Sequence, residues 1–279
     1  MKKVAVIAST HRSEISQSLR EFCDLLHGKA EIVLIDSDWK EDLSKLQADM
    51  VFVLGGDGTL LATARRMGSN QLPIVGINFG KLGFLAEFYF QDIANNINSI
   101  LESSTPPSKH VILECTIEEN GRTVQSFLAV NDIVVMRNNT PRMIELDISS
   151  RGKIVLKYQG DGLIIATPLG SSAHSMAAGG PLIFPELDVM VLTPVCPHTI
   201  ASRPIVIPAP HGLELEVASQ QEVTYTIDGQ VFNNLESEQK IIIRKAPVQL
   251  LLITGRKVNY YDLLKQKLNW GTPPNYRAL

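Results

Sequence analysis

The segment MVFVLGGDGTLLATARR, residues 50–66, holds one carboxylate among three glycines directly after an apolar run. Gly55, Gly56 and Gly58 allow backbone N–H groups to approach a phosphate at the start of the helical pattern that follows. A carboxylate inside an anion-binding loop needs a role, and Asp57 can accept a proton from an attacking hydroxyl or help to hold Mg²⁺ between phosphates. The segment therefore predicts phosphoryl transfer, although a glycine-rich turn with Asp57 as a helix cap explains the same residues.

Two further segments place polar or glycine residues where apolar strands end or are interrupted. GINFGKLGFL, residues 76–85, repeats the glycine pattern after the next apolar run. It predicts a second wall of the same cleft, and a turn closed by an apolar plug is the plainer alternative. Asn131-Asp132 interrupts an apolar strand, where polar groups must be hydrogen-bonded or kept for a ligand. A β-bulge or turn explains that pair as well.

Small residues dominate a fourth segment. From 170 to 180 every residue is Gly, Ala or Ser except His174 and Met176, which suggests backbone lying close to a ligand or a packed helix. A serine-hydrolase elbow, GxSxG, is excluded because His174 stands where the second glycine is needed.

The helices and strands that position these residues differ between the first hundred residues and the rest of the chain. The first hundred residues alternate between Val-, Ile- and Leu-rich runs and helical patterns, which indicates a parallel sheet covered on both faces, a Rossmann-like α/β unit. The expected strands are 3–9, 31–36, 50–56 and 72–78, and the expected helices are 13–28, 42–48 and one beginning over 59–67.

Beyond a Ser-, Thr- and Pro-rich stretch at 101–110 the apolar period becomes two, which predicts an antiparallel, β-rich region. Turns are expected at Asn120-Gly121, Arg151-Gly152 and Asp228-Gly229. The end of the chain, 259–270, returns to a helical pattern. We therefore expect an α/β domain over 1–105 that carries GGDGT, a β-rich domain over 106–245, and a C-terminal segment, 246–279, whose helix packs back on the first domain.

Composition narrows the class of protein. The chain has 279 residues, 44% of them apolar, and a net charge of −3, so it lacks the basic excess that nucleic-acid and membrane-surface binders show. Three cysteines without CxxC spacing argue against a disulfide framework or a cysteine metal site. No apolar run is long enough for a membrane span or a signal peptide, so the sequence predicts a cytoplasmic protein.

Taken in order, the motifs GGDGT, GINFGKLGFL, ND, DGLIIATPLGSSAHSMAAGGP, PHTIASRPIVIP and IDGQ resemble those of the NAD kinase family, over residues 4–271. Diacylglycerol kinases and phosphofructokinases carry close relatives of GGDGT, whereas the long Gly/Ala/Ser segment is far more specific. The resemblance implies an N-terminal α/β domain, a C-terminal antiparallel β-sandwich domain, and homodimers or homotetramers that share the site between subunits. It implies transfer of the γ-phosphoryl of ATP, or of a polyphosphate phosphoryl, to the 2′-hydroxyl of the adenosine ribose of NAD, giving NADP, with Mg²⁺ held mainly by the donor phosphates.

The resemblance also assigns residues. It implies that Asp57 orients or deprotonates the 2′-hydroxyl, with Gly58 beside it, and that Asn131 and Asp132 contact the adenine-side ribose or base. Further NAD-pocket positions are Arg142, Asp161, Ser172, Ala173, His174, Ser175, Ala177 and Gln230, and the phosphate-donor loop comprises Gly55, Gly56, Gly58 and Thr59. Three departures from the family pattern are Asp132 in place of Glu, His174 in place of Tyr, and TPLGSS in place of TPTGST.

Two other functions use similar residues. A lipid kinase must meet a membrane through basic or apolar surface, and neither the composition nor the termini offer one. A non-catalytic regulator that kept the pocket would bind NAD yet form no NADP with Mg-ATP. The intact loop around Asp57 favours the enzyme.

Overall fold

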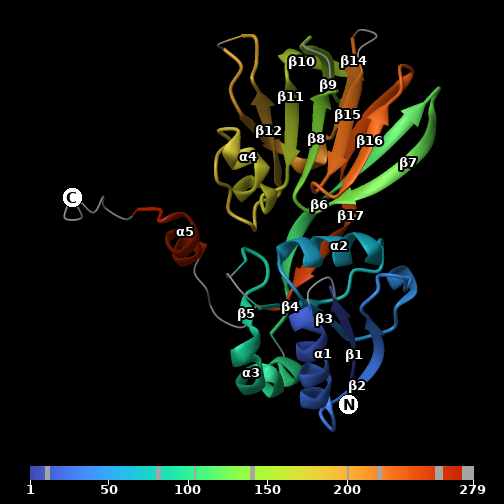
Figure 1. Cartoon of the computed structure of the whole chain (residues 1–279). Coiled ribbons are helices and arrows are strands. Elements are labelled where there is room, and N and C mark those ends of the chain that lie inside the picture. Colours follow the sequence, from blue (N-terminus) through green and yellow to red (C-terminus); the bar gives the residue numbers. More distant parts are fainter. Residues whose placement is uncertain are drawn as a thin grey trace.

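A computed structural model describes residues 1–9, 13–79, 83–103, 105–138, 142–199, 201–218, 222–254 and 260–271. Figure 1 shows two halves, a sheet flanked by helices α1, α2 and α3 and, beyond α2, a group of strands that carries α4. Gly80 and Lys81 of the second glycine segment, and Ile200 of PHTIASRP, lie outside the described residues.

The N-terminal half is a parallel sheet covered on both faces. Its strands pair in the order β4 (Ile74–Asn78), β3 (Met50–Leu54), β1 (Lys2–Ala8) and β2 (Ala30–Asp36), and β5 (Phe88–Tyr89) pairs with β4. Because side chains alternate along a strand, Val4 and Val6 pack with α1 (Ser13–Leu26) and α3 (Phe90–Glu102), whereas Ala5 and Ile7 pack with α2 (Asp57–Met67). The predicted Rossmann-like unit is confirmed.

The C-terminal half is a β-sandwich around one apolar core. One sheet has the order β13 (Ile205–Pro208), β12 (Val189–Val195), β11 (Gly162–Ala166), β8 (Asp132–Arg137), β15 (Val223–Ile227), β16 (Val231–Leu235). The facing sheet is formed by β10 (Lys153–Gly160), β9 (Ile144–Ser150), β14 (Leu213–Val217), β17 (Gln239–Leu252), β6 (Ser108–Glu119) and β7 (Arg122–Ala129). Short helices are η1 (Leu43–Lys45), η2 (Gly170–Ser172), α4 (His174–Ala177) and η3 (Ala209–His211).

Three of the tight turns lie where the sequence predicts them. Both residues of Asn120-Gly121, Arg151-Gly152 and Asp228-Gly229 have positive φ, between 50° and 75°. Such left-handed pairs match the twist of antiparallel strands and set their register. The predicted antiparallel, β-rich second region is confirmed.

Strand β17 connects the two halves. It pairs antiparallel with β6 and β14 in the sandwich, and its last residue, Leu252, pairs in parallel with Ile74 of β4. The parallel strands and one layer of the sandwich are therefore a single eleven-stranded sheet. The predicted division at 105 and 245 stays a prediction, and the strand runs through the second boundary.

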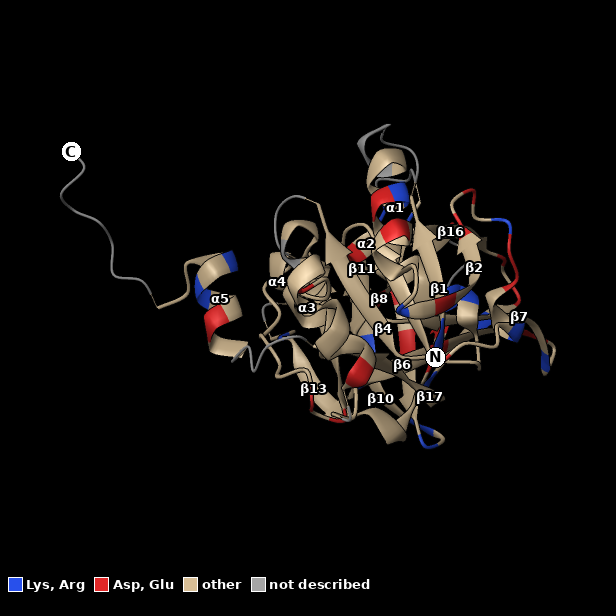
Figure 2. Ribbon diagram, turned by 90° about the horizontal axis from the view of Figure 1, so that it is seen from below, with Lys and Arg blue, Asp and Glu red and all other residues tan. Residues whose placement is uncertain are grey.

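Helix α5 (Tyr260–Leu268) contributes Tyr260 and Leu263 to a cavity that residues of both halves line, and its packing on the first domain stays a prediction. The ring of Phe184 contacts the rings of Tyr260, in a tilted arrangement, and Tyr261, edge-on, with ring centroids 5.0 and 5.3 Å apart. Figure 2 shows acidic and basic residues on this helix, with Asp262 in its first turn and lysines in its last, an order that complements the helix dipole. Among the described residues, no helix is long and apolar enough to cross a membrane.

Two elements differ from expectation. The helix expected over 42–48 is only the 3₁₀ turn η1, which Asp42 caps through the N–H of Ser44, because too few apolar residues follow Leu43 to bury a longer helix. Helix α3 was not predicted, although Ile93 and Ile97 of its buried face have helical spacing.

Candidate active site

Asp57 lies at the carboxyl edge of the parallel sheet, as the first residue of α2 directly after β3. Its Oδ2 accepts the N–H of Phe84 at 2.8 Å, and its Oδ1 accepts those of Leu85 at 3.1 Å and Ala86 at 3.0 Å. These donors belong to the loop after β4, and β3 and β4 are neighbours, so their ends meet at one edge. The second glycine segment is therefore a wall of the same cleft as Asp57.

The glycines around Asp57 have different surroundings. A Cβ on Gly55 would stand 2.4 Å from Thr59 Oγ1, so this glycine allows the helix to begin tightly against the strand. A Cβ on Gly56 would meet no protein atom within 4 Å. The backbone carbonyl of Gly58 accepts a hydrogen bond from Gln230 Nε2 at 2.9 Å, which brings the turn after β15 to the start of α2.

Asn131 and Asp132 enter β8 opposite this edge and are held by the carboxylate of Asp228. Asp228 Oδ1 accepts the N–H groups of Asn131 at 2.7 Å and Asp132 at 3.1 Å, and its Oδ2 accepts that of Val130 at 3.2 Å. Burial, and then repulsion by the Asp228 carboxylate, raise the pKa of Asp132 to about 7. The interrupted strand thus presents a carboxyl that changes charge near neutral pH.

The Gly/Ala/Ser segment lies directly over Asn131. A Cβ on Gly170 would stand 2.0 Å from the Asn131 carbonyl oxygen, so only glycine allows this approach. Thr167 fixes the same place, since its N–H donates to the Asn131 carbonyl at 2.8 Å and its hydroxyl donates to the Val130 carbonyl at 2.6 Å. The expected close backbone approach is present, but its partner is the strand that carries Asn131, which was neither of the two expected partners, a ligand or a packed helix.

The predicted pocket residues of this segment differ in exposure. Ser172 and Ala173 are half-buried, and His174 and Ala177 are exposed. Ser175 is fully buried, with its hydroxyl 2.7 Å from that of Thr193. The first four therefore face space that a ligand can reach, whereas the Ser175 hydroxyl is engaged inside the protein.

Arg142 and Asp161 lie apart from this cluster within one chain. Asp161 pairs with Arg137 Nε at 2.9 Å, at the far end of β8 from Asp132. Asp132 and Arg137 are five residue steps apart along the strand, which is about 17 Å. Arg142 is exposed and precedes β9 of the other sheet.

Sequence reasoning missed Arg65 and the role of Asp228. Arg65 Nη1 donates to Asp228 Oδ2 at 2.7 Å, and its Nη2 donates to Gln230 Oε1. Asp228 appears in the sequence as a turn residue and within the IDGQ motif, neither of which assigns it a partner, and Arg65 lies 163 residues away. No local spacing signals such a pair.

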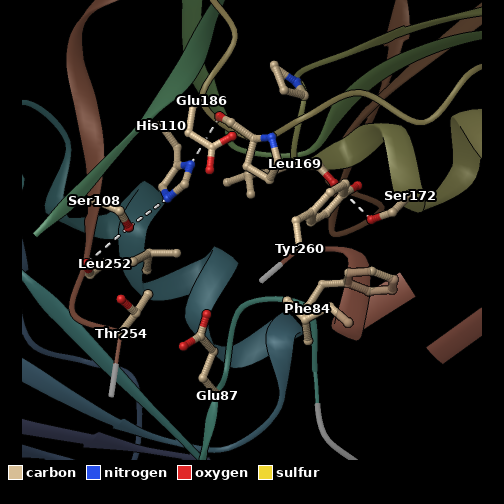
Figure 3. Close-up of a pocket in the computed structure, with 13 residues that line it drawn as sticks. Phe84, Glu87, Ser108, His110, Leu169, Ser172, Glu186, Leu252, Thr254 and Tyr260 are labelled. Carbon is tan, nitrogen blue, oxygen red and sulfur yellow. Dashed lines mark hydrogen bonds between the residues drawn. The ribbon is translucent and has the colours of Figure 1, made fainter. Parts of the chain in front are cut away.

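A cavity of about 160 Å³ is lined by residues of both halves and of α5, among them Phe84 and the predicted pocket residue Ser172 (Figure 3). His110 Nε2 lies 2.9 Å from the Ser108 hydroxyl, and its Nδ1 lies 3.2 Å from the Pro185 carbonyl. Burial lowers the pKa of His110, and it raises the pKa of Glu87 to about 7. Glu87 Oε2 is buried without a hydrogen-bond partner among the described residues. Two of the six lining segments, those with Phe84 and Ser172, were predicted to border a cleft, whereas the other four carry no local pattern that points to a cavity.

The described residues do not form a site for a protein-held metal ion. They contain no group of three or more His, Cys, Asp or Glu side chains suited to hold one. Both oxygens of Asp57 already accept backbone N–H groups. A divalent ion at this cleft would depend on oxygen ligands from the substrate phosphates.

Known proteins match this chain along nearly its whole length. Residues 4–105 match the ATP-NAD kinase N-terminal domain, and residues 130–255 match the ATP-NAD kinase C-terminal domain. An NAD kinase from Geobacter sulfurreducens is 35% identical, and one from Koribacter versatilis is 33% identical, each over 97% of this chain and 99% of its own length. The fold is shared with yeast NADH kinase complexed with NADH, at a TM-score of 0.89 and 21% identity over 99% of this chain and 90% of that one. It is also shared with an NAD kinase from Archaeoglobus fulgidus in complex with ATP, at a TM-score of 0.75 and 22% identity over 96% of each chain. The chain therefore belongs to the NAD kinase family.

Proposed function

We propose that this NAD kinase transfers the γ-phosphoryl of ATP, or a polyphosphate phosphoryl, to the 2′-hydroxyl of the adenosine ribose of NAD, with Asp57 orienting or deprotonating that hydroxyl. The observation that carries the proposal is the fixed carboxylate of Asp57. Oδ1 accepts two N–H groups from described residues and Oδ2 accepts one, so Oδ2 keeps an acceptor position for a hydroxyl hydrogen. Phosphoryl transfer depends mainly on positioning, and three backbone donors hold this group in one orientation.

The same edge of the sheet supplies sites for the rest of both substrates. Gly55, Gly56, Gly58 and Thr59 surround the N-terminus of α2, where N–H groups and the helix dipole favour donor phosphates. Asn131 and Asp132 lie across the cleft as contacts for the adenine-side ribose or base, beside Ser172, Ala173 and His174. We infer that Mg²⁺ is held mainly by the donor phosphates.

A homodimer or homotetramer completes the site. Arg142 and Asp161 lie apart from the Asp57 cluster within one chain, so we infer that a second copy brings them to the NAD. Gln230 and Ala177 line the pocket of the same copy that supplies Asp57. Ser175 is buried behind that pocket and stabilises its wall. Mixing inactive Asp57→Asn protein with inactive Asp161→Asn protein should restore activity in hybrid assemblies, and no recovery after subunit exchange would oppose a shared site.

We also propose that the protein is cytoplasmic. Cys23, Cys115 and Cys196 are all unpaired thiols, as expected in a reducing compartment.

The test of the reaction is Asp57→Asn, assayed with NAD, Mg²⁺ and each candidate donor, with NADP detected by a dehydrogenase specific for it. We expect kcat to fall by about 10²–10⁴-fold, the usual contribution of a positioned proton acceptor, while NAD still binds in calorimetry. Wild-type turnover in the variant would remove Asp57 from the mechanism. NAD binding without NADP formation by the wild type would support the regulator, and phosphorylation of a lipid would support the lipid kinase.

A further inference from the structure

Arg65 connects the helix that begins with Asp57 to the sandwich. Its side chain is 13% exposed, and that of its partner Asp228 is fully buried. The guanidinium also donates to Gln230, whose amide returns to the Gly58 carbonyl at 2.9 Å. Helix α2 is therefore tied at both its first and its third turn to the turn after β15.

Asp228 links Arg65 to the start of β8, the strand that carries Asn131 and Asp132. Besides Arg65, its carboxylate accepts the N–H groups of Val130, Asn131 and Asp132, and its own N–H donates to the Asp132 carbonyl at 2.9 Å. A fully buried carboxylate needs a compensating charge, and Arg65 supplies it. The ion pair thus joins two rigid pieces, one carrying Asp57 and the other carrying Asn131 and Asp132.

We propose that Arg65 and Asp228 are positioning residues that fix the distance across the active-site cleft, between Asp57 and the strand that binds NAD. This inference rests on the proposed function, because it assigns the two sides of the cleft to one reaction. Asp57 and Arg65 are eight residues apart on one helix, about 12 Å. A shift at Arg65 would therefore move Asp57 relative to a dinucleotide held by Asn131, and alignment errors of an ångström suffice to slow transfer.

The neighbouring residue offers a matched control. Arg66 Nη2 pairs with Asp36 at 2.5 Å, with side-chain exposures of 21% and 0%, and also donates to the Glu41 carbonyl. Its guanidinium lies 5.0 Å from the Trp39 ring centroid. This second buried ion pair starts from the same helix but stays within the N-terminal half, so its loss weakens the fold without releasing the cleft.

The experiment compares Arg65→Met with Arg66→Met in the full-length protein, measuring kcat, KM for NAD, Tm, and backbone hydrogen exchange of the segment 128–134. We expect both variants to lose stability. Only Arg65→Met should lower kcat tenfold or more and speed exchange at 128–134 several-fold. Arg65→Lys, which keeps the charge but loses the forked contact to Gln230, should recover part of kcat.

Equal losses of kcat in the two variants, or an Arg65→Met protein with either normal kcat or normal exchange at 128–134, would overturn the proposal. Where Arg65→Met does not fold, Arg65→Lys against Arg66→Lys gives the same comparison. Hydrogen exchange distinguishes a failure of this inference from a failure of the proposed reaction, because it does not depend on NADP formation. A wild type without NADP formation refutes the reaction, whereas unchanged protection at 128–134 refutes the role of Arg65.

Discussion

The carboxylate of Asp57 lies directly against the α-carbon of Gly83, so that a Cβ at residue 83 would stand 1.8 Å from Asp57 Oδ1. Both residues reach this place from loops that follow adjacent parallel strands. The contact leaves no room for any other residue at 83 while Asp57 keeps its three N–H donors.

Gly83→Ala should therefore disable the enzyme by displacing Asp57. We expect kcat to fall by about 10²-fold or more, as for loss of a catalytic carboxylate, with a smaller change in the KM for NAD. The measurement is steady-state kinetics of Gly83→Ala, Asp57→Asn and the double variant. Because both changes act through one carboxylate, the double variant should be no slower than Asp57→Asn alone. Additive losses would contradict this reading.

Gly56→Ala tests whether the donor phosphates lie against the loop. An added Cβ meets no protein atom, and the φ of −86° suits alanine, so the Tm should stay within about 2 °C of the wild type. If the donor occupies that open space, the KM for ATP rises at least several-fold while NAD affinity is kept. Gly55→Ala is the contrasting variant, because its Cβ collides with Thr59 and should lower stability as well. An unchanged KM for ATP in Gly56→Ala would place the phosphates elsewhere.

Asp132 should make the free energy of unfolding fall as pH rises through 4–7. The folded protein holds this proton up to a pKa of about 7, whereas the ordinary value is 3.8, so the stabilising contribution is complete below 3.8 and is lost above 7. Asp132→Asn removes the titration and should flatten the curve, gaining roughly 3–4 kcal/mol relative to the wild type between pH 4 and pH 8. Urea unfolding at several pH values measures it. Parallel curves for the two proteins would contradict a raised pKa.

Glu87, in the cavity that Phe84 lines, should make the free energy of unfolding depend on pH in a similar way. Burial raises its pKa from 4.5 to about 7, so the wild type again loses stability as pH rises through that window. We expect Glu87→Gln to recover about 2 kcal/mol at pH 8 and nothing at pH 4, allowing for partial solvent access. Glu236→Gln, at an exposed carboxylate, is the control and should change neither end of the curve. Loss of stability in Glu87→Gln at pH 8 would show that the carboxylate has a charged partner.

Local patterns were enough to predict β1 to β4 of the parallel sheet and three of the tight turns. Continuous apolar runs identify β1, β3 and β4 because these strands are buried on both faces, and Asn120-Gly121 and Asp228-Gly229 identify hairpins because their backbone needs positive φ. The same glycine pattern pointed to Asp57, since parallel strands end at one edge. These features depend on residues close together in the sequence.

Long-range partners could not be predicted. Nothing near Asp57 in the sequence shows that its acceptors are filled by Phe84, Leu85 and Ala86, and nothing near Arg65 points to Asp228. The burial of Glu87 likewise depends on how several distant segments meet. Such facts arise from the packing of the halves, which a single sequence without homologues does not encode in any local period.

The strand β17 also limits how the cleft can open. It crosses between the halves as a ribbon with β6, and near the crossing residues 246–248 face the single residue Ile112, a bulge that includes Pro247. Pulling the halves straight apart would break the ladder, whereas bending at the bulge turns one half about the ribbon axis. An opening of the cleft that kept this ladder intact would therefore have to bend the chain at residues 246–248, far in sequence from Asp57.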